Sequence, residues 1–364
     1  MTRKYNFGAG PATIPVEVLE EVKEELLDWR GLGLSVMEIS HRSQDFIEIA
    51  KTAESDFRDL LKIPEDYAVL FLHGGATLQC PMIPMNFCPQ GGTADYVNTG
   101  HWASRAIKEA QRYINVNISA SSEDDSFRFF PPQDNWKISD NSSYIHITPN
   151  ETIGGISLRN IEHEKIPIVA DYSSGILSEE LDVTKFSLIY GGAQKNIGPA
   201  GLGFAIIKKV ILHKAQENTP TMLNYTKMYE GESMYNTPPT FAWYVAGKVF
   251  KWLKSIGGIG EIGKINRRKA KKLYSFIDAS EFYSNNILES SRSIMNIPFQ
   301  LKNNDMNMTF LQESSEAGLL ALKGHRSVGG MRASIYNAMP EEGVDKLIDF
   351  MESFEKRNHN LTNG

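Results

Sequence analysis

The chain has 364 residues, more than a single hydrophobic core usually organises, and this length predicts about two domains. Its composition, 41% hydrophobic and 23% charged, is typical of a globular protein, and a net charge of −6 gives no general attraction to nucleic acid or to an anionic membrane. The only cysteines, Cys80 and Cys88, form neither a CxxC pair nor a disulfide framework, so we expect no metal site and two buried thiols.

The N-terminal sequence MTRKYNFGAGPATIP lacks the apolar segment of a signal peptide, and no run of about 18 apolar residues follows it. The sequence therefore predicts a cytoplasmic protein. The Asn-x-Ser match at Asn141 then has no chemical meaning, because glycosylation requires secretion.

Two amphipathic helices are predicted before residue 62. Apolar residues recur at helical spacing from Pro15 to Trp29, with the proline in the first turn, and again from Gln44 to Leu61. Each helix would bury one apolar face.

Beyond residue 62, short apolar runs alternate with helical segments such as the one from Trp102 to Arg112. The runs cover residues 67–72, 94–97, 113–118, 143–148, 166–170, 186–190 and 203–207. Because they are apolar throughout rather than alternating, they suit strands that are covered on both faces. The repetition of strand and helix predicts an α/β fold with a doubly wound, mostly parallel sheet.

A helix predicted from Thr240 to Ile256 leads into GGIGEIGK, residues 257–264, which contains a match to G-x-G-x-x-G. A dinucleotide site requires a strand before this motif, whereas a helix precedes it here, so we interpret the segment as a helix–helix linker. The basic run NRRKAKK, residues 266–272, is interpreted as a solvated helix face rather than as a polyanion site.

The last hundred residues alternate helix and strand and predict a second, smaller α/β domain. Its strands are expected at 294–301 and 332–336, and its last helix at 341–357. The final residues, 358–364, are expected to form a frayed tail.

Ligands of open α/β sheets bind beyond the carboxyl ends of the strands, so the residues that follow each apolar run are the candidate site. After the run at 67–72, Gly74 and Gly75 precede a predicted helix at Ala76–Thr77, whose N–H groups could bind an anion. Asp171 follows the run at 166–170 and could instead be a helix N-cap. Lys195 follows the run at 186–190 among small residues, and taken alone it could be a surface lysine.

These three features together match what pyridoxal phosphate requires. The helix N-terminus would bind its phosphate, the Lys195 amine would condense with its aldehyde, and the Asp171 carboxylate would keep its pyridine nitrogen protonated. Two unit charges about 4 Å apart interact by roughly 4 kcal/mol at an effective dielectric constant of about 20, which is enough to hold that proton at neutral pH. The small residues around Lys195 would let the cofactor approach the backbone.

Two His-Arg pairs, His41-Arg42 and His325-Arg326, lie in the sequence, and Arg332 follows the second pair closely. Arginine binds carboxylates and phosphates through two parallel hydrogen bonds. A single arginine is more often part of a surface salt bridge. Two such pairs indicate a substrate with more negative charge than a plain amino acid.

Several longer segments match a known family: NFGAGPA, SVMEISHRS, HGGATLQ, DYVNTGHW, PNETIGG, ADYSSGILS, GGAQKNIGPAG, NTPPTFAWY, KGHRSVGGMRASIYNAMP and GVDKLIDFM. Two of these matches, GAQKNIGPAG and NTPPTFAWY, are highly specific. Through them the chain resembles the phosphoserine aminotransferase family, fold-type-I pyridoxal phosphate enzymes of aminotransferase class V, along nearly its whole length. The resemblance implies a large cofactor-binding domain, residues 16–258, with a mostly parallel seven-stranded sheet flanked by helices. It also implies a smaller domain formed by residues 1–15 and 259–364, and a homodimer with shared active sites.

The resemblance further implies a role for each candidate residue. Lys195 and Asp171 would be the catalytic lysine and the partner of the pyridine nitrogen. The other cofactor contacts would be Trp102 on the ring, Thr152 at the 3′-oxygen, Ala76, Thr77 and Gln194 at the phosphate, and Asn236 and Thr237 at the phosphate from the other subunit. Arg332 would bind the substrate α-carboxylate, and His41, Arg42, His325 and Arg326 would bind its phosphate. Many members carry an arginine at the position of Thr77, so phosphate recognition here would depend on the other arginines and on hydroxyl or backbone donors.

The expected reaction is transfer of the amino group of L-glutamate to 3-phosphohydroxypyruvate, giving O-phospho-L-serine and 2-oxoglutarate for serine biosynthesis. Whether the chain also acts on the related four-carbon substrate of pyridoxine biosynthesis, which gives 4-phosphohydroxy-L-threonine, stays open. An alternative is another reaction with the same cofactor, a lyase or a cysteine desulfurase, although Cys80 and Cys88 lie in an apolar, proline-rich segment rather than on an exposed loop. A catalytically inactive binding protein on this scaffold is disfavoured by the joint presence of Lys195, Asp171 and Trp102.

Overall fold

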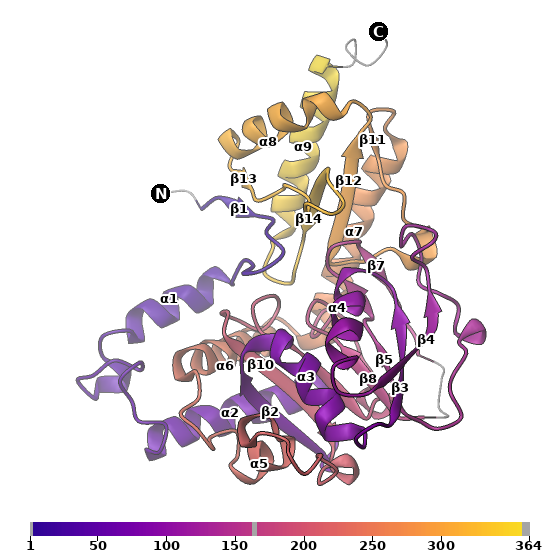
Figure 1. Cartoon of the computed structure of the whole chain (residues 1–364). Coiled ribbons are helices and arrows are strands. Elements are labelled where there is room, and N and C mark those ends of the chain that lie inside the picture. The colour runs from indigo at the N-terminus through magenta and orange to yellow at the C-terminus, as the bar shows by residue number, and fades with distance from the viewer. Residues whose placement is uncertain (1–2, 162–165, 359–364) are drawn as a thin grey trace.

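The computed structural model describes residues 3–161 and 166–358. Figure 1 shows two lobes: a lower one built on the seven-stranded sheet, and an upper one formed by the C-terminal elements, with the N-terminal β1 (Tyr5–Asn6) beside β13 (Leu319–Leu320). Among the described residues, no helix is both long and apolar enough to cross a membrane.

The central sheet has the strand order β2-β10-β9-β8-β5-β3-β4. Its strands are β2 (Tyr67–His73), β3 (Thr93–Asn98), β4 (Asn115–Ser121), β5 (Ser142–Ile147), β8 (Ile168–Asp171), β9 (Leu188–Gly192) and β10 (Leu202–Lys208). Among these seven strands only β10 runs opposite to the others, so the other six strands end at the same edge of the sheet. The predicted mostly parallel sheet of seven strands is confirmed.

Several predicted boundaries are wrong by two residues or more: the helix expected at 102–112 ends at Ala110, the strands expected at 166–170 and 294–301 begin at Ile168 and Asn296, and the strand expected at 332–336 ends at Ser334. Two further differences have a clear physical reason. The first helix, α1 (Val16–Glu25), ends before Trp29, which lies in a separate 3-10 turn with its side chain 2% exposed. Gly31 and Gly33 have positive φ angles in this turn, which a helix cannot accommodate. The strand expected at 113–118 begins only at Asn115, because the two residues before it belong to the turn that closes the preceding helix.

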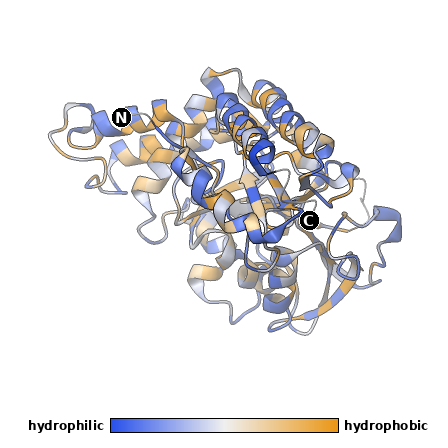
Figure 2. Cartoon of the chain, turned by 90° about the horizontal axis from the view of Figure 1, so that it is seen from above, coloured by the Kyte–Doolittle hydropathy of each residue, from blue (hydrophilic) through white to orange (hydrophobic). Residues whose placement is uncertain are grey.

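The remaining helices of the lower lobe cover the sheet. They are α2 (Gln44–Leu61), α3 (Gly75–Phe87), α4 (His101–Ala110), α5 (Tyr225–Glu230) and α6 (Thr240–Ser255). In Figure 2 the helices change between blue and orange along their length, as expected when one face is buried and the other is exposed. The predicted bounds of α2 agree with the structure at both ends.

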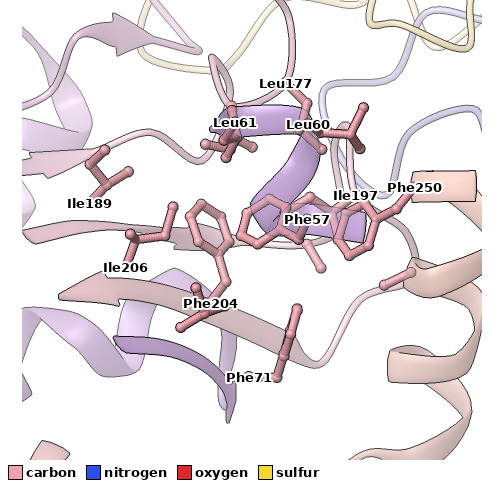
Figure 3. Packing of buried hydrophobic residues seen from close by; sticks show 14 of the residues in the cluster. Phe57, Leu60, Leu61, Phe71, Leu177, Ile189, Ile197, Phe204, Ile206 and Phe250 are labelled. Atoms are coloured by element: carbon pink, nitrogen blue, oxygen red, sulfur yellow. The ribbon is translucent and has the colours of Figure 1, made fainter. Parts of the chain in front are cut away.

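An aromatic cluster joins α2 and α6 to the sheet (Figure 3). Phe57 of α2 stacks on Phe250 of α6 with ring centroids 4.9 Å apart, and it meets Phe204 of β10 edge-on at 5.7 Å. Such pairs add about 0.5–1.5 kcal/mol each to the free energy gained by burying their apolar area. They hold β10 and its neighbours in place beneath the edge where the polar residues gather.

The upper lobe has a hydrophobic core of its own. It is formed by α7 (Gly258–Ala279), β11 (Tyr283–Ser284), β12 (Asn296–Leu301), α8 (Asn307–Glu316), β14 (Met331–Ser334) and α9 (Glu341–Asn358), and it includes Phe7 from the N-terminal segment. The first turns of α7 pack into the lower core and its later turns into the upper one. The domain division between residues 258 and 259 stays a prediction, and residues 359–364 of the predicted tail lie outside the described residues.

Two interpretations of α7 are wrong. Of the glycines of GGIGEIGK, Gly257 is the N-cap between α6 and α7, whereas Gly258, Gly260 and Gly263 lie inside the helix rather than in a linker, because Ile259 and Ile262 bury one of its faces. The run at 266–272 is not uniformly solvated: Lys269 is 0% exposed, and its ammonium donates to the carbonyls of Ile335, Tyr336 and Met339 at 2.9–3.0 Å. Lys269 therefore fixes the turn that follows β14.

Candidate active site

A cavity of about 410 Å³ lies at the edge where the parallel strands end. The predicted cofactor residues that line it are Ala76, Thr77, Trp102, Thr152, Asp171, Gln194 and Lys195. They come from five different strand ends and the loops that follow them, so the fold brings together residues that are up to about 120 positions apart in sequence.

Lys195 lies in the turn after β9 and is 8% exposed. Its Nζ donates a hydrogen bond of 2.6 Å to Thr152 Oγ1. Burial lowers the pKa of Lys195 to about 8, although the nearby Asp171 and Glu151 carboxylates act in the opposite direction. A substantial fraction of this amine is therefore neutral near physiological pH, which a nucleophilic lysine requires.

Asp171 is the last residue of β8. Its Oδ1 accepts hydrogen bonds from the backbone N–H of Ser173 at 2.9 Å and from the Ser173 hydroxyl at 2.5 Å. Ser173 Oγ in turn accepts the N–H of Gly192, which ties the carboxylate to the end of β9. Because both bonds go to Oδ1, Oδ2 has no hydrogen-bond donor among the described residues and can interact with a cation in the cavity.

The N-terminus of α3 provides an anion cradle. Gly74 and Gly75 have φ angles of 76° and 58°, a conformation that favours glycine, and the helix begins at the second of them. The first N–H groups of a helix have no partner within it, and the helix dipole attracts negative charge there. A Cβ at Gly203 of β10 would lie 3.1 Å from the Gly75 carbonyl oxygen, so a glycine there lets the cradle sit close against the sheet.

Several buried polar atoms around the cavity have no partner in the described part of the chain. Trp102 Nε1 and Thr148 Oγ1 belong to residues that line it, and Arg332 Nε belongs to a residue that contacts the lining residue Thr152. Buried polar groups without partners cost about 1–3 kcal/mol each, so native proteins rarely keep them without a ligand. Together with the anion cradle, Lys195 and Asp171, these atoms fit an aromatic ligand that carries a phosphate group.

Thr152 is held from several sides. Its Oγ1 accepts from Lys195 and donates to Ser174 Oγ at 3.0 Å, and Ser174 donates to the Asn150 carbonyl at 2.8 Å. Asn150 Nδ2 also reaches Asn296 of β12 at 2.9 Å, so this network connects the site to the upper lobe. The position of the Thr152 hydroxyl therefore depends on both lobes.

The predicted substrate residues lie at different distances from the cavity. Arg332 is adjacent, with its Nη1 3.5 Å from the Thr152 carbonyl oxygen. His325 packs near His101, with ring centroids 5.2 Å apart, and Arg326 is exposed beside it. His41, Arg42, Asn236 and Thr237 do not line the cavity of their own chain.

Sequence reasoning missed several residues of the site. Gly10, Pro11, Thr148, Asn150, Ser173, Ser174, Ala200 and Gly201 also line the cavity, and His101 and Glu151 lie next to it. Most of them follow directly after a strand or adjoin a predicted residue, and this position in the sequence could have identified them as site residues. Gly10 and Pro11 belong to the segment NFGAGPA but follow no strand of the sheet, since the N-terminal segment reaches the site through contacts such as the Ala12 N–H to the Gln194 carbonyl.

The surroundings of the two cysteines disfavour a role as a desulfurase nucleophile or as a metal ligand. Cys80 lies within α3, and burial raises the pKa of its thiol to about 12. Cys88 is buried, and burial raises the pKa of its thiol as well. Neither is the exposed, acidic thiol that a desulfurase uses. Within the described residues, no cluster of three His, Cys, Asp or Glu side chains could hold a metal ion.

This combination of an α/β fold, a buried lysine and an anion cradle is typical of a pyridoxal phosphate-dependent enzyme. The model of the family described as aminotransferase class V matches residues 4–347. A phosphoserine aminotransferase from Hahella chejuensis is 54% identical over 357 residues, which cover 98% of this chain and 99% of that protein.

Solved structures agree with this assignment. A phosphoserine aminotransferase structure from a study of radiation damage to its Schiff base superposes with a TM-score of 0.96 at 43% identity, covering 98% of this chain and 100% of the other. A pyridoxal phosphate-bound phosphoserine aminotransferase from Trichomonas vaginalis gives a TM-score of 0.91 at 38% identity, covering 96% and 100%. The chain therefore belongs to the phosphoserine aminotransferase family.

The burial of Lys195 predicts how cofactor binding depends on pH. Only the neutral amine attacks an aldehyde, and the pKa of Lys195 is lowered from 10.5 to about 8. The second-order rate constant for adding pyridoxal phosphate to the cofactor-free protein should therefore rise with pH and level off above about 8. Stopped-flow absorbance measures it, and borohydride reduction with mass spectrometry checks the attachment to Lys195. A rate that keeps rising towards pH 10.5 would contradict a buried amine.

Proposed function

We propose that this protein transfers the amino group of L-glutamate to 3-phosphohydroxypyruvate, giving O-phospho-L-serine and 2-oxoglutarate in serine biosynthesis. The observation that carries the proposal is the buried Lys195 amine, which shares one cavity with Asp171 and the N-terminus of α3. The names of the similar proteins support the substrate. Formation of 4-phosphohydroxy-L-threonine for pyridoxine biosynthesis is an extension that the same site would permit.

The cofactor is pyridoxal phosphate, which when bound carries the amino group between the two substrates and withdraws electrons from the substrate Cα. The N–H groups of Ala76 and Thr77, with Gln194, would hold its phosphate. The Asp171 carboxylate would pair with its pyridine nitrogen and keep that nitrogen protonated. Thr152 Oγ1 would bind its 3′-oxygen, and the Trp102 indole would pack on its ring.

Lys195 has two tasks in this mechanism. Its amine would hold the cofactor between turnovers, and the same amine, once free, would remove the proton from the substrate Cα. A pKa near 8 suits this base, because general catalysis is most effective when the pKa lies near the working pH. The overall reaction is ping-pong, since the first product leaves before the second substrate enters the same cavity.

Charged residues around the cavity hold the substrate. Arg332, beside Thr152, binds the α-carboxylate that both substrates share. His41, Arg42, His325 and Arg326 bind the phosphate of the phosphorylated substrate. This arrangement would favour O-phospho-L-serine over L-serine, because the neutral hydroxyl of L-serine would leave these cations without a partner.

A homodimer with shared active sites accounts for the residues that lie outside their own cavity. Asn236 and Thr237 are exposed in the single chain, as is Arg42. Large apolar side chains in the same segments are also exposed: Leu27 at 83%, Met37 at 57% and Tyr235 at 52%. A partner subunit that covers these side chains would bury apolar area and bring Asn236 and Thr237 to the phosphate of the neighbouring site.

The proposed substrate is tested by replacing Arg326 with leucine. Loss of one charge-assisted contact to a dianionic phosphate should raise the KM for O-phospho-L-serine by about 10-fold or more, with a smaller rise for L-glutamate. Steady-state kinetics of both half-reactions measure this difference, with Arg112→Leu, an exposed arginine just after α4, as the control. Equal increases for both substrates would contradict a phosphate-binding role.

The shared site is tested by mixing two inactive variants, Lys195→Ala and Asn236→Ala/Thr237→Ala, at a cofactor concentration that saturates only the wild type. Half of the dimers would be mixed, and each of these would contain one complete site, so about a quarter of the wild-type activity should return. Activity equal to the sum of the two separate variants would show that Asn236 and Thr237 serve their own subunit or none.

A further inference from the structure

Glu151 is a buried carboxylate for which neither cofactor nor substrate binding accounts. It ends β6 (Asn150–Glu151), directly before Thr152, and its side chain is 0% exposed. Burying a charged carboxylate is costly unless hydrogen-bond donors compensate for the lost water. The donors that Glu151 uses therefore indicate what it does.

Both donors are backbone N–H groups at the start of α4. Glu151 Oε2 accepts from the N–H of Trp102 at 3.2 Å, and Oε1 accepts from the N–H of Ala103 at 2.9 Å. The N-cap residue, Gly100, has no side chain to supply such a bond. A residue about 50 positions further along the chain thus caps this helix, and its negative charge lies at the positive end of the helix dipole.

The backbone around Gly100 fits the position of this carboxylate. Gly100 has a φ angle of 155°, and a Cβ built on it would lie 2.8 Å from Glu151 Cδ and 3.1 Å from Oε1. Any other residue there would displace the carboxylate from the two N–H groups. The chain therefore combines a glycine at the N-cap of α4 with a glutamate on β6 to form one close contact.

This contact lies between two cofactor residues. Trp102, whose backbone N–H donates to Glu151, lines the cavity, and its ring centroid is 5.9 Å from Lys195 Nζ. Thr152, the next residue after Glu151, accepts the hydrogen bond from Lys195. A shift of Glu151 would therefore move the group above the cofactor ring and the group at its 3′-oxygen together.

The electrostatic surroundings are consistent with this position. Burial raises the pKa of Glu151 to about 7, the N–H groups of Ala103 and Trp102 oppose this rise, and the charge of Asp171 adds to it. Lys195 also acts to lower the pKa of Glu151. The two N–H groups and the lysine thus favour the ionised form that the capping contact uses.

We propose that Glu151 is a positioning residue: by holding the first turn of α4, its carboxylate sets the orientation of the Trp102 indole over the cofactor ring. The inference rests on the proposed function, because the orientation of Trp102 matters only when a ring occupies the cavity. Glu151 itself touches neither cofactor nor substrate in this account.

The test compares Glu151→Gln with Glu109→Gln, a partly exposed glutamate near the other end of α4. The side-chain oxygen of a glutamine can accept a hydrogen bond from one of the two backbone N–H groups, but its NH₂ group then faces the other donor and cannot accept from it. We expect the Kd for pyridoxal phosphate, measured by quenching of tryptophan fluorescence, to rise by about 10-fold in Glu151→Gln and to stay at the wild-type value in Glu109→Gln. The circular dichroism that the protein induces in the bound cofactor should also change at saturation, because it reports the orientation of the ring.

A second variant and a double-mutant cycle keep the proposal testable if Glu151→Gln folds poorly. Glu151→Asp keeps the charge but shortens the side chain, and it should change Kd in the same direction. In a Trp102→Ala background, Glu151→Asp should have little further effect on Kd, because the residue through which it acts is gone.

The outcomes separate this inference from the proposed function. If the wild type binds pyridoxal phosphate and the Glu151 variants melt at lower temperature but keep the wild-type Kd and induced circular dichroism, Glu151 is only structural and the inference is overturned. If the wild type itself binds no pyridoxal phosphate, the proposed function fails and the inference fails with it.

Discussion

Six of the seven central strands run in one direction, and their carboxyl ends therefore meet along one edge. The chemistry depends on this constraint, since β8 ends in Asp171, β9 leads to Lys195 and β2 leads to the anion cradle of α3. The antiparallel β10 has a different task. Its Gly203 lies against Gly75 and lets the start of α3 approach the sheet.

The second constraint is the removal of water from Lys195. Lowering its pKa from 10.5 to about 8 corresponds to roughly 3 kcal/mol of free energy that disfavours the ammonium form. Asp171 and Glu151 oppose this change but do not cancel it. The amine stays partly neutral at physiological pH, while the same low-polarity surroundings strengthen every charged interaction that a bound cofactor makes. The aromatic packing of α2 and α6 under the sheet supplies the rigid base for this arrangement.

Much of the fold and of the site could be predicted from the sequence, because apolar runs identify buried strands and the residues after them identify the site. Lys195 and Asp171 followed from this reasoning alone, whereas Trp102, Thr152, Asn236 and Thr237 depended on the resemblance to a family. Periodicity did not reveal that Lys269 is buried, since its three carbonyl partners lie 66 to 70 residues away. Glu151 was missed for a similar reason, because a buried cap looks like any other glutamate until the fold places a helix against it.

In the proposed function, one cavity combines a lysine-bound cofactor with recognition of a phosphate. This combination is tested by the visible absorption spectrum of the protein loaded with pyridoxal phosphate, titrated with O-phospho-L-serine and separately with L-serine. We expect O-phospho-L-serine to convert the spectrum to that of pyridoxamine phosphate at concentrations at which L-serine has no effect. Conversion by L-serine at equal or lower concentration would contradict the assigned substrate, although the role of Lys195 would stand.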